Sequence, residues 1–263
     1  MKLCSATWTT LVSFKPVFLH FELLIEMGRL CEAVFGRKKL PERCLIYAGS
    51  YIPKRKEFVR SLFENWQRIK GQWVKYSFAY AARREFLVIF NVYGAAMVLE
   101  IIQLLKDGDA RKIFLAGALG GKELPVGTLV LPTKIIDKTG FVSADKPRKQ
   151  IVRPKRDCLK RLRKILGNLG VAYVEGGIVS VPCVLHNIDH IKKFVEQRPS
   201  ILGVELETSS FYHYSQRESL DGYALLYISD NKKYDIISGA KNVEEARKKS
   251  LTKITHVAIK ILE

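Results

Sequence analysis

Cysteine is scarce in this sequence, and its placement argues against both a disulfide framework and a zinc site. The 263 residues hold five cysteines, an odd number, and no two of them form a CxxC pair. Disulfide-rich domains carry paired cysteines, and structural zinc sites use closely spaced ones. His186 and His190 have the spacing of two ligands on a helix, but the sequence offers no suitably spaced third ligand. We therefore expect a cytoplasmic protein without a metal site, whose cysteines are Cys4, Cys31, Cys44, Cys158 and Cys183.

Long apolar runs are absent as well. The sequence has no uncharged apolar stretch of the length that a membrane-spanning helix requires, which is about 18 residues. Its N-terminus mixes apolar residues with Thr, Ser, Lys and His, whereas a signal peptide has one continuous apolar block. The sequence thus predicts a soluble protein that makes no membrane contact.

Acidic residues are few relative to basic ones. Lys and Arg number 44 and Asp and Glu 26, which gives a net charge of +18. Such a charge suggests a polyanionic partner, either nucleic acid, a membrane surface or a phosphate-bearing substrate. The densest segment, residues 146–164, holds ten basic residues and one Asp. It is either a solvated helix face, which we favour, or a nucleic-acid contact; no aromatic side chain is interleaved to stack on single-stranded bases.

The remaining pattern is that of a folded α/β protein. From residue 43 onward, short apolar runs alternate with amphipathic stretches, which predicts a single domain over 43–263 with a mostly parallel or mixed central sheet flanked by helices. Residues 1–42 read as an N-terminal helical extension, with a helix over 17–35. The expected strands are 44–49, 74–81, 85–92, 112–117, 128–137, 171–181, 201–205 and 222–230, and the expected helices are 54–70, 94–106, 159–166, 187–197, one from 205, and 243–262.

Glycines and carboxylates gather directly after the predicted strands. Ligands of open parallel sheets bind at the carboxyl ends of the strands, so these residues are candidates for a common site. They are Ala48–Ser50, Gly117–Gly121, Gly203–Glu207 and Ser229–Asn231. Gly94, which opens a predicted helix, would also point backbone N–H groups at an anion.

Three of these segments resemble one enzyme family. Residues 117–137 (GALGGKELPVGTLVLPTKIID), 203–211 (GVELETSSF) and 227–231 (YISDN) are similar, in order and spacing, to segments of the purine nucleoside phosphorylase, uridine phosphorylase and methylthioadenosine nucleosidase superfamily. The resemblance implies a small-molecule nucleoside substrate, whose N-glycosidic bond is cleaved through an oxocarbenium-like sugar. It also implies a homo-oligomer, dimer or hexamer, that needs no cofactor and uses phosphate as co-substrate if it is a phosphorylase.

The resemblance also assigns roles to the carboxylates. It implies that Asp230 is the acid at the base, although an Asp after a strand can also be a helix N-cap. It implies that Glu207 binds the ribose hydroxyls and that Leu206 lies against the sugar. Glu205 either joins them or bonds to an internal partner. The base would contact Ser180, Val184, Leu185 and Ser229.

The nucleophile site departs from the family pattern. The resemblance places it at Gly49, Arg55, Gly117 and Ala118, and Arg55 is a good phosphate ligand. Phosphorylases carry Arg and Ser or Thr where this chain has Leu115 and Ala118. Our leading hypothesis is phosphorolysis of a purine-type nucleoside. Hydrolysis of the same bond, or an inactive relative that binds nucleic acid, are the alternatives.

Overall fold

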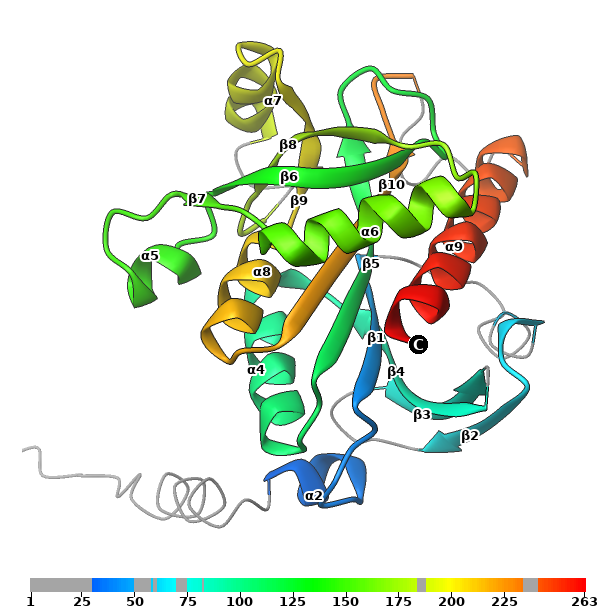
Figure 1. The fold of residues 1–263 in the computed structure, drawn as a ribbon. Coiled ribbons are helices and arrows are strands. Elements are labelled where there is room, and N and C mark those ends of the chain that lie inside the picture. The colour runs from blue at the N-terminus through cyan, green and yellow to red at the C-terminus, as the bar shows by residue number, and fades with distance from the viewer. Residues whose placement is uncertain are drawn as a thin grey trace, which may run out of the picture.

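The computed structural model describes residues 30–49, 58, 61–69, 75–81, 83–183, 188–233 and 241–263 (Figure 1). The strands are β1 (Arg43–Ala48), β2 (Asn65–Ile69), β3 (Lys75–Ala81), β4 (Arg84–Val92), β5 (Lys112–Gly121), β6 (Leu129–Asp137), β7 (Ile151–Val152), β8 (Val174–Ser180), β9 (Ile201–Glu205) and β10 (Asp221–Asp230). The helices are α2 (Leu30–Phe35), α4 (Gly94–Asp107), α5 (Phe141–Asp145), α6 (Arg156–Asn168), α7 (Ile188–Glu196), α8 (Thr208–Arg217) and α9 (Lys241–Leu262).

The described strands form one mixed sheet in the order β10-β6-β8-β9-β5-β1-β4-β3-β2, with β7 paired to β6. Because β10 also pairs with β5, the strands β5, β9, β8, β6 and β10 close into a ring. Strands β1, β5 and β10 run parallel in its middle, so their carboxyl ends reach the same edge. This arrangement confirms the predicted α/β class with a mixed central sheet.

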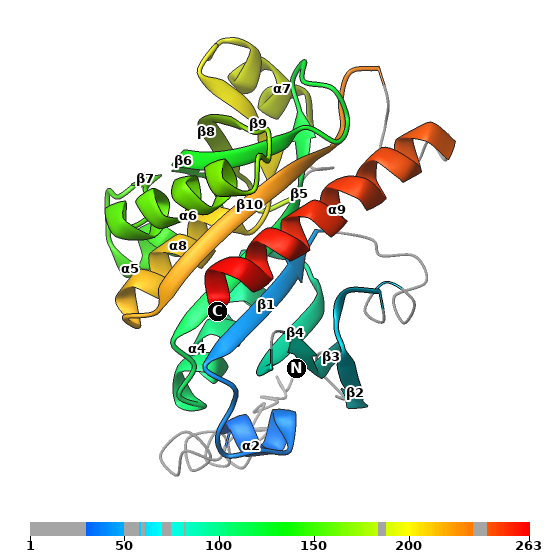
Figure 2. The same ribbon diagram turned by 45° about the vertical axis from the view of Figure 1, so that its right-hand side comes forward.

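Helices cover both faces of the sheet and divide the core in two (Figure 2). One half packs α2, α4 and α8 against the sheet, and the other packs α6 and α9 against the opposite face. The middle strands are buried on both sides, which explains why β1, β5 and β10 read as continuous apolar runs. A third, smaller cluster lies under α7.

Most of the expected elements are present, but several boundaries differ, three of them near the candidate site or at the sheet edge. The helix expected over 54–70 is wrong at its end, because Asn65–Ile69 forms strand β2, which pairs antiparallel with β3. Strand β5 continues past Gly117 to Gly121, since β10 and β9 supply pairing partners along that length. Helix α8 begins at Thr208 and not at Glu205, which still belongs to β9.

The described end of the N-terminal segment packs into the core. Of the helix expected over 17–35, residues 17–29 lie outside the described residues. Cys31, Phe35 and Leu40 are buried in the core half that contains α4. Arg37 lies over the Phe78 ring at 3.7 Å and pairs with Glu85 at 2.8 Å. The division of the chain at residue 42 stays a prediction.

The basic segment 146–164 contributes helix α6. Leu162 and Leu166 of this helix are buried against the sheet, while its basic side chains are exposed. Within the described ranges, no helix has the length and apolar character to cross a membrane.

Candidate functional site

Glu207 stands at the junction of β9 and α8, where it is almost fully buried, with 2% of its surface exposed. Its Oε1 accepts a hydrogen bond of 2.6 Å from the backbone N–H of Gly94, the first residue of α4, and its Oε2 accepts one of 3.3 Å from Leu206 N. Sequence reasoning expected the N–H groups at Gly94 to face an anion. In the structure, the N–H group of Gly94 faces the carboxyl group of Glu207.

Burial and charge make Glu207 a weak acid. Desolvation, followed by the neighbouring carboxylate of Glu205, raises the pKa of Glu207 to about 8, against the lowering effect of the two backbone donors. The pKa of Glu205 is also raised by burial. Two acidic side chains therefore lie close together in a buried, desolvated environment, an arrangement common at functional sites.

Glu205 is held by partners within the protein. Its Oε1 accepts a hydrogen bond from the Ser180 hydroxyl. Its Oε2 accepts bonds of 2.7 Å from Glu207 N, Thr208 N and the Thr208 hydroxyl. Since these donors belong to the first turn of α8, Glu205 fixes the turn that carries Glu207. The sequence left open whether Glu205 binds the sugar or bonds to an internal partner, and the geometry favours the internal partner.

Ser180 is likewise engaged inside the protein. It is fully buried and lies opposite Glu205 in the β8–β9 pairing. Besides donating to Glu205, its hydroxyl accepts a 3.0 Å bond from Ser209 N. The Ser209 hydroxyl donates in turn to Asp137 at 2.7 Å. The contact between Ser180 and a base therefore stays a prediction, and the observed role of this hydroxyl is to support Glu205.

Asp230 ends strand β10 and faces β5. The Ser229 hydroxyl donates to its Oδ1, and a methyl group placed on Gly120 would stand 3.3 Å from its Oδ2. Arg247, on α9, donates from Nε to the carbonyl oxygen of Ser229 at 2.7 Å. The sequence reasoning missed Arg247, because it lies 17 residues after Asp230 (247 − 230) with no motif to mark it.

The end of β1 lies between Glu207 and β5. Gly49 has a left-handed φ of +59°, and a methyl group there would stand 3.6 Å from Glu207 Oε2 and 3.8 Å from the Ala118 methyl carbon. Glycine thus leaves room for something small beside the carboxylate. Ala118 and Gly120 are two residues apart on β5, so they share one face and connect the Glu207 end of the site to Asp230.

The other predicted nucleophile residues contribute no side-chain donor here. Leu115 is fully buried in the core, and Gly117 is packed against Leu226, where a methyl group would approach to 2.7 Å. Gly117 therefore lies within a strand and not in a turn. Arg55, together with Val184 and Leu185 of the predicted base wall, lies outside the described residues.

A cavity of about 540 Å³ opens beside Asn231, the residue that follows Asp230, and Asp230 itself does not line it. This volume is in the range of small-molecule sites. It is lined by the β5–β6 loop, the residues after β10 and the first turns of α9, among them Lys122, Glu123, Pro125, Asn231, Lys233 and Val243. The described parts of the chain hold no group of three His, Cys, Asp or Glu side chains that could bind a metal ion.

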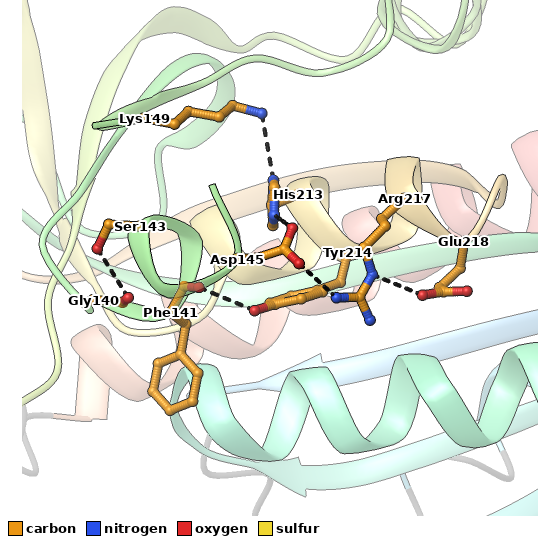
Figure 3. A network of polar contacts seen from close by, with 9 residues as sticks. All are labelled: Gly140, Phe141, Ser143, Asp145, Lys149, His213, Tyr214, Arg217 and Glu218. Atoms are coloured by element: carbon orange, nitrogen blue, oxygen red, sulfur yellow. Dashed lines mark hydrogen bonds and ion pairs between the residues drawn. The ribbon is translucent and has the colours of Figure 1, made fainter. Parts of the chain in front are cut away.

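The far end of α8 is fixed by a second polar network (Figure 3). His213 is buried, and its Nε2 lies 2.6 Å from Asp145 Oδ2, while Lys149 Nζ lies 3.3 Å from its Nδ1. Burial lowers the pKa of His213, so the neutral ring accepts from Lys149 and donates to Asp145. Asp145 also binds Arg217 at 2.9 Å. With Glu205 at one end and this network at the other, α8 is a rigid support for Glu207.

Comparison with known protein families identifies the family to which this chain belongs. The sequence model of the phosphorylase superfamily matches residues 77–263, about 70% of the chain (187 of 263). The chain belongs to the phosphorylase superfamily. The match confirms the family resemblance and makes this an enzyme of the nucleoside phosphorylase and nucleosidase group. Among curated protein sequences, none matches significantly.

Solved structures of this superfamily share the fold at low sequence identity. Uridine phosphorylase from Vibrio fischeri is 16% identical, with a TM-score of 0.74 over 85% of this chain and 91% of that one. Purine nucleoside phosphorylase from Toxoplasma gondii is 18% identical, with a TM-score of 0.70 over 84% and 91%. The 5′-methylthioadenosine/S-adenosyl homocysteine nucleosidase from Campylobacter jejuni is 14% identical, with a TM-score of 0.67 over 83% and 97%. At such identities the similarity establishes the fold alone.

Proposed function

We propose that this protein cleaves the N-glycosidic bond of a purine-type nucleoside by transferring the ribosyl group to phosphate. The observation that carries the proposal is the placement of Glu207 beside Gly49 and of Asp230 beside Gly120, at the edge of the sheet where the parallel strands end. This pair of acids suits the two halves of a nucleoside. A carboxylate can accept hydrogen bonds from two vicinal sugar hydroxyls, and a protonated carboxyl can donate to a ring nitrogen of the base.

Each bond change in the proposed reaction then has a group to support it. The bond between sugar C1′ and the base nitrogen breaks, and its electron pair goes to the base. Asp230 donates a proton to the base as it leaves. A phosphate oxygen bonds to C1′ and gives ribose 1-phosphate. Glu207, in its ionised form, holds the sugar hydroxyls and stabilises the positive charge that develops on the ring.

Purine preference rests on Asp230. A purine is a poor leaving group as an anion and benefits from protonation, which Asp230 would supply. Leu206, Ser229 and the wall around Val184 and Leu185 would contact the substrate, with Ser180 behind them. The related structures include enzymes named for uridine as well as for purines, so the test compares both classes.

Hydrolysis is the second candidate, and it is favoured by one observation. The buried Leu115 and the methyl group of Ala118 supply no hydrogen-bond donor for a phosphate, which leaves Arg55 as the proposed ligand. Water could then replace phosphate as the nucleophile at C1′, and the product would be free ribose.

The test is to incubate the purified protein with inosine, adenosine, methylthioadenosine and uridine, with and without phosphate, and to measure the free base by chromatography. Release from a purine nucleoside that requires phosphate supports the proposal. Release without phosphate assigns hydrolysis, and release from uridine alone overturns the purine preference. If no base is released from any of the four, the enzymatic proposal is wrong.

We further propose that the enzyme works in the cytoplasm as a homo-oligomer, dimer or hexamer, without a cofactor. The family resemblance supports the assembly, and the described cysteines are free, which fits a reducing compartment. Light scattering after size-exclusion chromatography measures the assembly, and a monomeric mass would contradict it.

A further inference from the structure

Most of the positive charge of this protein has no role in the proposed reaction. Phosphate and nucleoside need one or two cations, whereas the chain carries a net charge of +18. On helix α6, the exposed basic residues Lys160, Arg161 and Lys164 recur at the three- and four-residue spacing that places side chains on one side of a helix. Among the described residues, none of these three forms an ion pair.

Basic side chains from three strands meet this side of α6. Arg43 begins β1, Arg84 begins β4 and Lys112 begins β5. Arg43 lies opposite Lys112 in the β1–β5 pairing, and Asp221 lies opposite Lys112 in the β10–β5 pairing. Asp221 is 3.6 Å from Lys155, the residue before α6, so the helix begins beside these strand ends. Burial, followed by the positive charges of Arg161, Arg43 and Arg84, lowers the pKa of Lys112, in agreement with this arrangement. We call Arg43, Arg84, Lys112, Lys160, Arg161 and Lys164 the basic face.

Few described acidic groups lie at the basic face, and one of them, Asp157, is exposed on α6 three residues before Lys160 and four before Arg161. The carbonyl oxygen of Leu262, at the carboxyl end of α9, accepts bonds from Arg43 Nε at 2.8 Å and from Lys112 Nζ at 3.5 Å. Glu42 lies 3.7 Å from Arg43, and Asp221 is paired with Lys155 at 3.6 Å. These contacts offset part of the repulsion, and the remaining cations favour an external anion.

We propose that the basic face binds the phosphate backbone of double-stranded nucleic acid. Two adjacent rows of phosphates match cations that are spread over α6 and the starts of three strands better than a single small anion does. Lys160, Arg161 and Lys164 bring no aromatic neighbour that would stack on unpaired bases, which argues against single strands. A membrane surface would require apolar side chains beside the basic ones, and the exposed residues of α6 from Arg156 to Lys164 are charged.

The basic face lies at the edge of the sheet opposite the proposed nucleoside site. Strands β1 and β5 run parallel and side by side (Figure 1). Their first residues therefore lie at one edge of the sheet, and Gly49, which follows β1, and Gly120, near the end of β5, lie at the other. A bound duplex would therefore leave the nucleoside site open. The two activities can be tested separately, and failure of one leaves the other standing.

The test measures binding of fluorescein-labelled 20-base-pair RNA and DNA duplexes by fluorescence anisotropy between 50 and 200 mM salt. The variant Lys160→Gln/Arg161→Gln/Lys164→Gln removes three charges from exposed positions. If all three contact phosphates, the salt slope on DNA becomes shallower by about 2.7, at about 0.9 per contact, and affinity at low salt falls at least about tenfold. Nucleoside cleavage by this variant should stay unchanged.

A charge-matched control removes the same number of positive charges elsewhere. Lys106→Gln/Lys192→Gln/Lys193→Gln changes exposed residues of α4 and α7, and its duplex affinity should stay within about twofold of the wild type. An equal loss in both variants would overturn the proposal, since net charge alone would then explain binding. Wild-type protein that binds phosphatidylserine vesicles or single strands more tightly than either duplex would overturn it as well. Equal binding of RNA and DNA duplexes supports recognition of the phosphate backbone. Binding of one duplex alone identifies which of the two nucleic acids the basic face binds.

Discussion

The two ends of the proposed nucleoside site are built differently. At the Glu207 end, every group is positioned by others: Gly94 binds the carboxylate, Glu205 fixes the first turn of α8, and Ser180 supports Glu205. At the nucleophile end, Leu115 is buried in the core and Ala118 presents only a methyl group. In the proposed mechanism, the preorganised groups around Glu207 hold the sugar. The choice of nucleophile then depends on Arg55, the proposed phosphate ligand.

Replacement of Asp230, the proposed acid at the base, should have the largest effect on catalysis. Asp230→Ala should lower kcat for a purine nucleoside about 10²–10⁴-fold, the usual contribution of a general acid. Asp230→Asn is the matched control, because an amide can still donate a hydrogen bond although it cannot transfer a proton. Steady-state kinetics on inosine provides the measurement, and an unchanged kcat in Asp230→Ala would remove this residue from the mechanism.

The pH profile tests Glu207. Because its pKa is raised to about 8, the ionised fraction grows as the pH rises toward that value, and kcat/KM should rise with it. Glu207→Gln removes the titrating group, so this limb of the profile should vanish. It should also raise KM about 10–100-fold through loss of a charged hydrogen-bond acceptor. A limb that persists in Glu207→Gln would assign the titration to another group.

Ser180→Ala tests whether the support behind Glu207 matters. The substitution leaves Glu205 without one donor and should reduce the free energy of unfolding by about 1–3 kcal/mol. If Glu205 positions Glu207, KM for the nucleoside should rise while kcat stays nearly constant. Thermal unfolding and steady-state kinetics measure the two effects, and Ser143→Ala on α5 serves as control. A lower stability with an unchanged KM would show that the support is structural only.

Ala118→Ser tests the nucleophile end of the site and should have the smallest effect. A hydroxyl at this position would give phosphate a donor and should lower the KM for phosphate about 2–10-fold. Ala144→Ser, at an exposed position on α5, is the control and should change nothing. A phosphate KM that stays constant in Ala118→Ser would mean that the nucleophile does not lie beside this residue.

The sequence predicted the acidic end of the site better than its supports. Glu207 and Asp230 were readable because each follows an apolar strand, and the carboxyl ends of β9 and β10 do meet near β5. The role of Ser180 was not readable, since it depends on the pairing that sets β8 against β9. Strand β2 was missed because a short edge strand that gains its partner from β3 has a weak apolar pattern of its own.

The most direct test of the account is the phosphate dependence of base release in wild type and in Arg55→Gln. If Glu207 and Asp230 bind the nucleoside and Arg55 binds the phosphate, the rate at which wild-type enzyme releases the base from inosine should saturate with phosphate. The sugar product should be ribose 1-phosphate. In Arg55→Gln the phosphate KM should rise about 10–100-fold, as expected for loss of a charged hydrogen bond, with the inosine KM unchanged. Release that is independent of phosphate, and equal in both proteins, would contradict the account and make the enzyme a hydrolase.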